Sequence, residues 1–450
     1  MRPMRFVPLA AALAAALGAS SASAQSLLAL YEAARAQDAA WQSARAQFEA
    51  NLARADQARA GILPTANLSS SYSRTQADIV GIPPTPGVNN PNYFGTQNTT
   101  LSASQPLYRP ANWYTWQQGK RQADLAQAQL LVAEQDLIIR ISQAYFDVLA
   151  AQDTLAFVRA QKTAVGEQLA SAKRNFEVGT STITDTREAQ ARYDLVVAQE
   201  IAADNDLRVK KLALDTLAGS ANVNPVPVAS SIELGPPQPD DVEAWVTQAE
   251  AASPAVQQAR IGVEVAKLET EKARAGHKPT LDLQASYGVI RNINGTTTNP
   301  LAPSSTRPAI AQAGLVLNVP IFAGFATQNR VRETVALEDK AQADLDNARR
   351  TIAQNTRAAY FGLVSGQGQV RALEAAEASS QSALDANRLG YQVGVRINID
   401  VLNAQSQLFQ TKRDLAQARY NVLLGQLKLR QANGTLVPDD LARLNALVTK

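Results

Sequence analysis

Cysteine is absent from this 450-residue sequence, and histidine occurs only once. Disulfide and thiol chemistry are therefore excluded, and the usual zinc, haem and histidine-based catalytic sites lack their ligands. The sequence also contains no G-x-S-x-G motif, no P-loop and no G-x-G-x-x-G motif after a strand. We therefore predict that the protein is not an enzyme and has no cofactor or metal site. The lone His277 is interpreted as an interface residue.

Long apolar runs are scarce, and the clearest one lies at the N-terminus. Arg2 and Arg5 precede an apolar run, and Ala22-Ser23-Ala24 follows it, a pattern typical of a cleaved secretory signal peptide. We expect residues 1–24 to be removed on export, without a lipid anchor because no cysteine follows. No later stretch has the 18 or more consecutive apolar residues of a spanning helix. The mature protein is therefore expected to be soluble in the periplasm or inserted by strands.

An excess of positive charge is also lacking once the signal peptide is set aside. The full sequence has 43 basic and 40 acidic residues, and two of the basic residues, Arg2 and Arg5, lie in the signal peptide. The mature chain is therefore nearly neutral, and we predict no nucleic-acid partner.

The sequence contains two copies of one pattern, about 215 residues apart. Ala60-Gly61 and Pro64-Thr65 recur 215 positions later as Ala275-Gly276 and Pro279-Thr280, and Ala144-Tyr145-Phe146 recurs at the same spacing as Ala359-Tyr360-Phe361. Several matches on one diagonal indicate a duplication. The predicted organisation is a signal peptide (1–24), a first repeat (25–222), a Pro-rich linker (223–239), a second repeat (240–434) and a C-terminal tail (435–450).

Each repeat follows the same predicted plan. A helix ends at a proline, two strands with period-two alternation enclose a Gly/Pro/Asn-rich loop, and a very long helix precedes a shorter return helix. In the first repeat these segments are 26–61, 65–78, 96–108, 111–176 and 185–218. In the second repeat they are 241–276, 281–289, 315–321, 323–392 and 400–433.

Four strands of about ten residues are long enough to cross a bilayer, but a four-stranded sheet has open edges and cannot close alone. Two, three or four copies would give 8, 12 or 16 strands, all permitted numbers. Leu283 and Leu317 are predicted to face outward. Aromatic residues near the strand ends either form a membrane-interface belt or pack a helix–strand junction. They are Tyr108, Trp113, Tyr114, Trp116, Phe322 and Phe325.

The duplicated plan and two turn motifs resemble the TolC family of outer-membrane efflux proteins. The motifs are Phe176–Asp185 and Tyr391–Gln405, each with V-G a few residues before an Asp, and the likeness covers about residues 26–434. The resemblance implies an α+β membrane protein with two structural repeats and four transmembrane β-strands per chain. In a homotrimer these would complete a 12-stranded barrel in the outer-membrane lipid, above a long periplasmic α-helical barrel that forms a tunnel.

The resemblance also implies a function and its partners. The protein would be the exit duct of a tripartite efflux pump or a type I secretion system. It would passively conduct substrate from a periplasmic adaptor and an inner-membrane transporter to the exterior. The alternative from the residues is a periplasmic coiled-coil adaptor or scaffold protein, which would need no detergent for extraction. The sequence does not identify the cargo.

The two helical turns carry the candidate site residues. From the residues alone, Asp185 with Glu188 three positions on is expected to begin the return helix as a capping box. The resemblance implies a gate that closes the periplasmic end of the tunnel, made of Thr184, Asp185, Tyr391, Arg396, Asp400 and Asn403. Asn403 stands where a second acid is often found, which would weaken cation selectivity.

The same turns are the segments that resemble the family's contact with the adaptor. These docking candidates are Val178, Gly179, Thr180, Val393, Gly394 and Val395. Ordinary turn chemistry also accounts for the Val-Gly stretches, because glycine ends helices readily.

Overall fold

A computed structural model describes residues 25–78, 80–81, 86, 92–227, 235–296 and 305–448. The predicted signal peptide (1–24) lies outside these residues, as do parts of the two strand loops and of the linker. The chain divides into two compact units. Unit 1 comprises the chain up to Arg45, Leu130–Val256 and the chain from Arg349, whereas unit 2 comprises Ala46–Gln129 and Gln257–Ala348.

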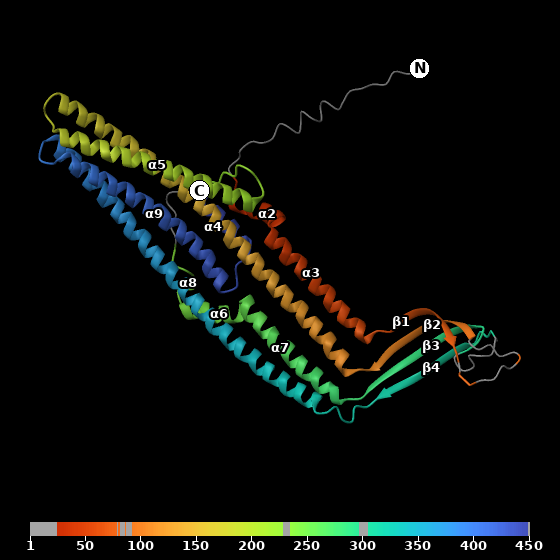
Figure 1. Ribbon diagram of the computed structural model, residues 1–450. Helices are drawn as coiled ribbons and strands as arrows, with labels where there is room; N and C mark the ends of the chain where they lie inside the picture. Colours follow the sequence, from red (N-terminus) through yellow and green to blue (C-terminus); the bar gives the residue numbers. More distant parts are fainter. Residues whose placement is uncertain are drawn as a thin grey trace, which may run out of the picture. The chain divides into compact units, whose positions relative to one another are not determined.

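The elements follow the predicted order of helix, strand pair and long helix, twice (Figure 1). The helices are α2 (Leu27–Gln37), α3 (Ala39–Arg59), α4 (Pro110–Glu177), α5 (Ile183–Ala218), α6 (Val242–Ala252), α7 (Pro254–Arg274), α8 (Ala326–Gln392), α9 (Asn398–Ala432) and α10 (Asp439–Val448). Short 3-10 turns, η1 (Ala60–Ile62) and η2 (Ala275–His277), precede the strands β1 (Thr65–Ala77), β2 (Asn92–Tyr108), β3 (Thr280–Ile293) and β4 (Ala309–Asn318).

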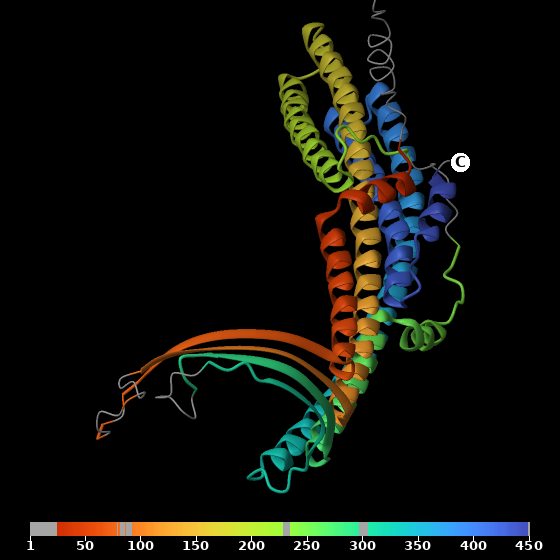
Figure 2. The ribbon, with the colours of Figure 1, turned by 90° about the vertical axis from the view of Figure 1, so that its right-hand side faces the viewer.

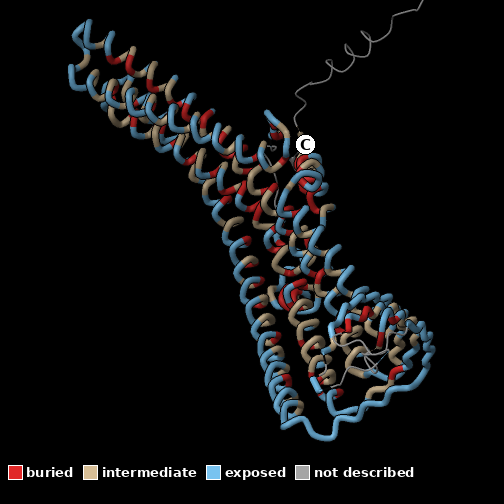
Figure 3. The backbone as a smooth tube through the Cα atoms, turned by 45° about the vertical axis from the view of Figure 1, so that its right-hand side comes forward, coloured by how far each residue is buried: buried red, intermediate tan, exposed pale blue. Residues whose placement is uncertain are grey.

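The core of unit 1 lies along the long helices. Leu137, Ile141 and Val148 of α4 are fully buried, and they cluster with Leu423 and Leu427 of α9. Their spacings of four and seven residues place them on one helical face, which confirms the apolar stripe expected from the sequence. In Figure 3 buried positions recur along the helices. In the sheet the edge strands β1 and β4 are almost wholly exposed, whereas β2 and β3 mix exposed, intermediate and buried positions.

The prediction of one helix over 26–61 is wrong in one respect, because the segment forms two helices, α2 and α3. Asp38 between them has extended backbone angles, and its carboxylate accepts a hydrogen bond from the Trp41 amide at 2.7 Å, so it begins a new helix. The helix predicted over 241–276 is broken in the same way at Ser253, directly before Pro254. Proline disfavours helical angles in the residue before it but suits a first helical position.

Unit 2 contains an antiparallel sheet in the order β1-β2-β3-β4. Its strands run side by side and curve together (Figure 2). The strands β2 and β3 are longer than predicted, since they begin at Asn92 and end at Ile293, respectively. The strand β4 ends at Asn318, so Val319 and Ile321 were wrongly included in it.

The predicted C-terminal tail also contains a helix, α10. Leu441 and Leu444 of this helix are buried against the unit 1 core, and the buried carboxylate of Asp440 pairs with Arg430. Over the described part of the chain, none of the helices carries an apolar stretch sufficient to cross a membrane.

Candidate functional site

The two turns that join the long helices to their return helices have the same backbone structure and lie at the same end of unit 1 (Figure 1). In the first, the Thr180 amide donates to the Asn175 carbonyl at 2.8 Å and the Gly179 amide to the Phe176 carbonyl at 3.0 Å. In the second, the Val395 amide donates to the Gly390 carbonyl at 2.9 Å and the Gly394 amide to the Tyr391 carbonyl at 3.2 Å. This pattern is the Schellman motif, which satisfies the last carbonyls of a helix.

A glycine closes each motif in the left-handed region. The φ angle is +75° at Gly179 and +81° at Gly394, where a side chain would be strained. The flanking valines project into solvent: Val178 is 72% exposed, Val393 65% and Val395 75%. The structure of the turns therefore explains why glycine is required at these two positions, but it does not explain why the neighbouring exposed side chains are apolar.

The first return helix begins with a capping box one turn earlier than the sequence suggested. Thr182, not Asp185, is the N-cap, and Asp185 is the third helical residue. The Asp185 amide donates to the Thr182 hydroxyl at 3.2 Å, and the Asp185 carboxylate accepts from the Thr182 amide at 3.0 Å. The predicted pairing of Asp185 with Glu188 was wrong because Thr182 already provides the side-chain oxygen that an N-cap requires.

The Asp185 carboxylate is held inside its own turn. One of its oxygens also accepts hydrogen bonds from the hydroxyls of Ser181 and Thr182, both at 2.8 Å. Partial burial by itself raises the pKa of this carboxyl, but the hydrogen bonds from Ser181 and Thr182 outweigh burial and lower the pKa below its usual range. Asp185 is therefore a charged cap at neutral pH. Thr184 beside it is exposed.

The second return helix lacks this cap. Ile397 occupies the N-cap position and makes no side-chain cap bond. The Asp400 carboxylate, at the third helical position, instead lies 3.6 Å from the Arg396 guanidinium. Tyr391 packs against the small apolar cluster of Leu384, Val401 and Leu408.

The two turns of one chain are joined by a residue that the sequence analysis missed. Asn398 is fully buried, donates from Nδ2 to the Asp185 carbonyl at 3.3 Å, and accepts a hydrogen bond from Gln168. In the repeat alignment Asn398 occupies the position of Ile183, and this apolar-to-amide difference was the available signal. Nearby, Arg192 donates to the Asn403 side-chain oxygen at 2.8 Å.

The structure thus brings together some of the predicted gate residues and not others. Arg396 and Asp400 are neighbours in one turn, and Asn403 meets the first repeat through Arg192. In the described part of a single chain, no hydrogen bond or ion pair connects the Asp185 carboxylate to Tyr391 or Arg396. A latch between these three residues would therefore have to form between copies of the chain.

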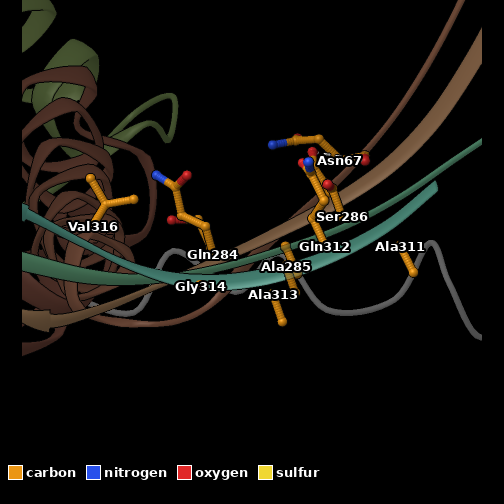
Figure 4. A pocket seen from close by; sticks show the side chains of 12 residues that line it. Asn67, Gln284, Ala285, Ser286, Ala311, Gln312, Ala313, Gly314 and Val316 are labelled. Atoms are coloured by element: carbon orange, nitrogen blue, oxygen red, sulfur yellow. Dashed lines mark hydrogen bonds between the residues drawn. The ribbon is translucent and has the colours of Figure 1, made fainter.

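The sheet in unit 2 has one polar and one apolar face. The pairing places Asn67, Ser102, Ser286 and Gln312 in one row across the four strands. These side chains help to line a hollow of about 720 Å³. In Figure 4, Asn67, Ser286 and Gln312 point to one side of the sheet, and Ala311 and Ala313 point to the other. The next row, on the other face, is Leu68, Leu101, Tyr287 and Ala311. Leu283 and Leu317, which were predicted to face outward, share this apolar face.

The aromatic residues near the helical end of the strands form two ring pairs. Trp113 and Trp116 meet edge-on at 4.9 Å between ring centroids, and Phe322 and Phe325 meet edge-on at 5.4 Å. Phe322 is 75% exposed and Phe325 64%. Among the described residues, no group of three or more His, Asp or Glu side chains is placed to hold a metal ion.

Comparison with protein families gives a match to the model described as "Outer membrane efflux protein", over residues 30–220 and again over 245–435. The chain is 33% identical to the outer membrane protein TolC of Vibrio cholerae over 434 residues, which covers 96% of each chain. It is 31% identical to the alkaline protease secretion protein AprF of Pseudomonas aeruginosa, over 91% of this chain and 85% of that protein.

Solved structures support the same assignment at the level of the fold. The Campylobacter jejuni CmeC outer membrane channel superposes with a TM-score of 0.76 at 16% identity, over 94% of this chain and 89% of that one. The protein is thus an α+β channel-type protein of the outer membrane, and it serves as an exit duct for efflux or type I secretion. The chain belongs to the outer membrane efflux protein family.

Proposed function

We propose that three copies of the chain assemble into one passive exit duct. Their twelve strands would close into a barrel in the outer membrane, and their long helices would line a periplasmic tunnel. The single observation that carries this proposal is the exposure of the two edge strands, β1 and β4. Every residue of β4, and every residue of β1 except the last, is exposed in the isolated chain.

Closure between copies would satisfy both edges at once. A strand edge presents unpaired backbone donors and acceptors, which cannot remain unpaired in lipid. Because β1 to β4 alternate in direction, β4 of one copy and β1 of the next are antiparallel, so the pattern of the sheet continues across the joint. The polar face would then line the lumen, and the apolar face with Leu68, Leu101 and Leu315 would contact lipid.

Cysteine cross-linking tests this assembly directly, because the natural chain contains no cysteine. A cysteine at Ser69 or Ser71 of β1 is combined with one at Gln312 of β4 on the polar face, and a cysteine at Ser70 is combined with one at Ala311 or Ala313 on the apolar face, so that both faces and several registers are sampled. Pairs whose Cα atoms approach within about 7 Å should cross-link between chains and give covalent dimers and trimers. A ladder that stops at dimers or continues to tetramers would contradict three copies.

The matched control lies inside the sheet. Ser102 of β2 and Ser286 of β3 are directly paired within one chain. Cysteines at these two positions should cross-link within the chain and leave its mass in denaturing gels unchanged. Intermolecular products from this control would mean that the bands report random collision instead of assembly.

The two turns are proposed as the contact with a periplasmic adaptor, through which an inner-membrane transporter delivers substrate. Exposed apolar side chains gather there although the surrounding helix surfaces are largely polar: Phe176, Val178, Ile183, Leu389, Val393, Val395 and Ile397. Exposed apolar groups of this kind favour a protein partner. The duct itself would perform no catalysis, since the sequence carries no G-x-S-x-G motif, no P-loop and no G-x-G-x-x-G motif after a strand.

The gate is proposed at the same turns. Asp185 of one copy would face Tyr391 and Arg396 of its neighbour, while Thr184, Asp400 and Asn403 would line the narrow end. The support is chemical: charged side chains repeated by symmetry at the tip of a hollow helical bundle can hold it shut through individually weak contacts. An adaptor that binds the adjoining valines could compete with those contacts and open the duct.

A further inference from the structure

Three arginines gather at the loop end of the sheet, outside the turns that were proposed as gate and docking site. Arg74 lies near the end of β1, Arg291 lies near the end of β3, and Arg307 lies just before β4. All three are exposed. They lie on the apolar face of the sheet, at the end away from the helices.

The pairing of the strands establishes which face they occupy. Arg74 is opposite Gly95, and Arg291 is opposite Gln97, and both positions share the face of Leu101 and Tyr287. Asn292 pairs with Thr306, and their side chains bond to each other at 2.9 Å on the polar face. Since side chains alternate along a strand, Arg291 and Arg307 project from the opposite, apolar face.

The position along the strands is that of a membrane interface. The apolar face runs from Leu281 to Val289 on β3, and eight residue steps span about 27 Å along the strand, which is about 20 Å of height at the strand tilt of about 40° that is usual in outer-membrane barrels. Arg291 comes two residues later, about 26 Å above Leu281 in height, and therefore at the outer edge of an apolar band about 25 Å tall. Because the helical part is periplasmic, this end of the sheet meets the outer leaflet.

Tyrosines flank the arginines on the same face. The Arg74 guanidinium lies 5.7 Å from the centroid of the Tyr93 ring. The Tyr72 ring covers Gly95, since a Cβ atom added there would lie 3.0 Å from the Tyr72 hydroxyl oxygen. Tyrosines at this level are typical of the boundary between hydrocarbon and headgroups.

The positive charge is not balanced within the chain. Arg291 and Arg307 are neighbours across the strand pair, and like charges in that arrangement destabilise a sheet. No ion pair of the three arginines occurs in the described part of the chain. In the sequence from Thr65 to Gln105 and from Leu283 to Asn318, Asp78 is the only acid.

We infer that Arg74, Arg291 and Arg307 bind the phosphate groups of the phosphorylated glycolipid of the outer leaflet. Guanidinium groups bind phosphate through paired, charge-assisted hydrogen bonds. A phosphate on the headgroup lies just outside the hydrocarbon layer, at the height of Arg291, and would relieve the repulsion between Arg291 and Arg307. This inference rests on the apolar face meeting lipid and is independent of the gate.

Binding of purified lipid A to the full-length protein in detergent tests the inference. The probes are bisphosphorylated lipid A and the same lipid after removal of both phosphates. The intact protein should bind the first far more tightly. Replacing all three arginines (R74Q, R291Q and R307Q together) should weaken binding of the first probe by about tenfold or more, whereas the matching lysine variant should retain most of it.

A second triple variant, R59Q, R332Q and R371Q, removes three exposed arginines from the helices and should bind lipid A normally. Equal binding of both probes to the intact protein would overturn the inference, even if the glutamine variant failed to assemble. So would displacement of lipid A by an equal concentration of inorganic phosphate, which would indicate a simple anion site. The cross-linking ladder, measured on the same samples, reports assembly separately.

Discussion

The two faces of the sheet can be distinguished by placing one charge at successive positions of β3. The rows of paired residues put Leu281, Leu283, Ala285, Tyr287 and Val289 on the apolar face and Gln284 and Ser286 on the polar face. We predict that arginine at Ala285, the centre of the apolar series, impairs assembly most. Arginine at Ser286, the adjacent residue, should be tolerated because it would point into the lumen.

The expected loss of stability depends on how deep in the bilayer the arginine lies. An arginine on the lipid face costs about 2–4 kcal/mol at the midplane and about 0–1 kcal/mol near the interfaces. Ala285 is flanked on both sides by alanines, Ala103 and Ala313, so no neighbouring acid offsets the charge. Leu283 should cost slightly less, and Leu281, opposite Leu317 at the periplasmic end, should cost least. In a trimer the midplane cost would amount to about 6–12 kcal/mol per assembly.

The assay is urea-induced unfolding of the reconstituted protein in phospholipid vesicles, with the yield of assembled protein in the outer membrane as a second measure. The free energy of unfolding should pass through a minimum at position 285 and recover towards 281 and 289. A Ser286 variant as unstable as the Ala285 variant would refute the assignment of faces. A series without a minimum would show that β3 does not cross the bilayer along its length.

Four further outcomes are expected. Replacing Asp185 and Arg396 together by alanine should raise single-channel conductance in planar bilayers, whereas Thr182→Ala, which removes only the cap, should not; an equal rise in both would assign the effect to capping. Asp400→Asn should mainly weaken block by divalent cations added on the periplasmic side, and unchanged block would remove Asp400 from the cation path. Val178→Glu with Val393→Glu should abolish cross-linking to the adaptor yet leave the trimer intact, and normal cross-linking would move the docking site elsewhere. Burial alone would raise the pKa of Glu269, but hydrogen bonds from Gln118, Lys272 and Arg330 outweigh it and hold the pKa at about 2. Because this pKa is lowered on folding, its contribution, of order 1 kcal/mol after solvent screening, is present above pH 4.5 and lost as the pH falls towards 2. The difference in thermal unfolding between the natural chain and Glu269→Gln should therefore disappear at low pH, and a difference that persists there would exclude this charge effect.

The sequence by itself determined the features that depend on periodicity and on repetition. Matches at one constant spacing revealed the duplication, and the absence of proline together with a spaced apolar stripe revealed the long helices. Both signals are local, because a helix buries one face at regular intervals whatever packs against it. The two Val-Gly turns were recognisable for the same reason, since only glycine adopts the required backbone angles without strain.

Breaks and caps were less accessible from the sequence. The interruption at Ser253 was visible as Pro254, but the one at Asp38 depends on a side chain that competes with the helix for its own backbone. The capping box was misplaced because Thr182 and Asp185 are both good N-caps, and the choice between them depends on where the preceding Schellman turn ends.

Only the tertiary structure decided which side chains meet across repeats. The bond from Asn398 to the Asp185 carbonyl joins residues more than 200 positions apart, and so does the bond from Arg192 to Asn403. The arginines at the loop end of the sheet are likewise scattered in the sequence, and the register of four strands places them on one face. Such contacts depend on the packing of one helix or strand against another, which no local pattern encodes, because the same amide or guanidinium could equally well face water.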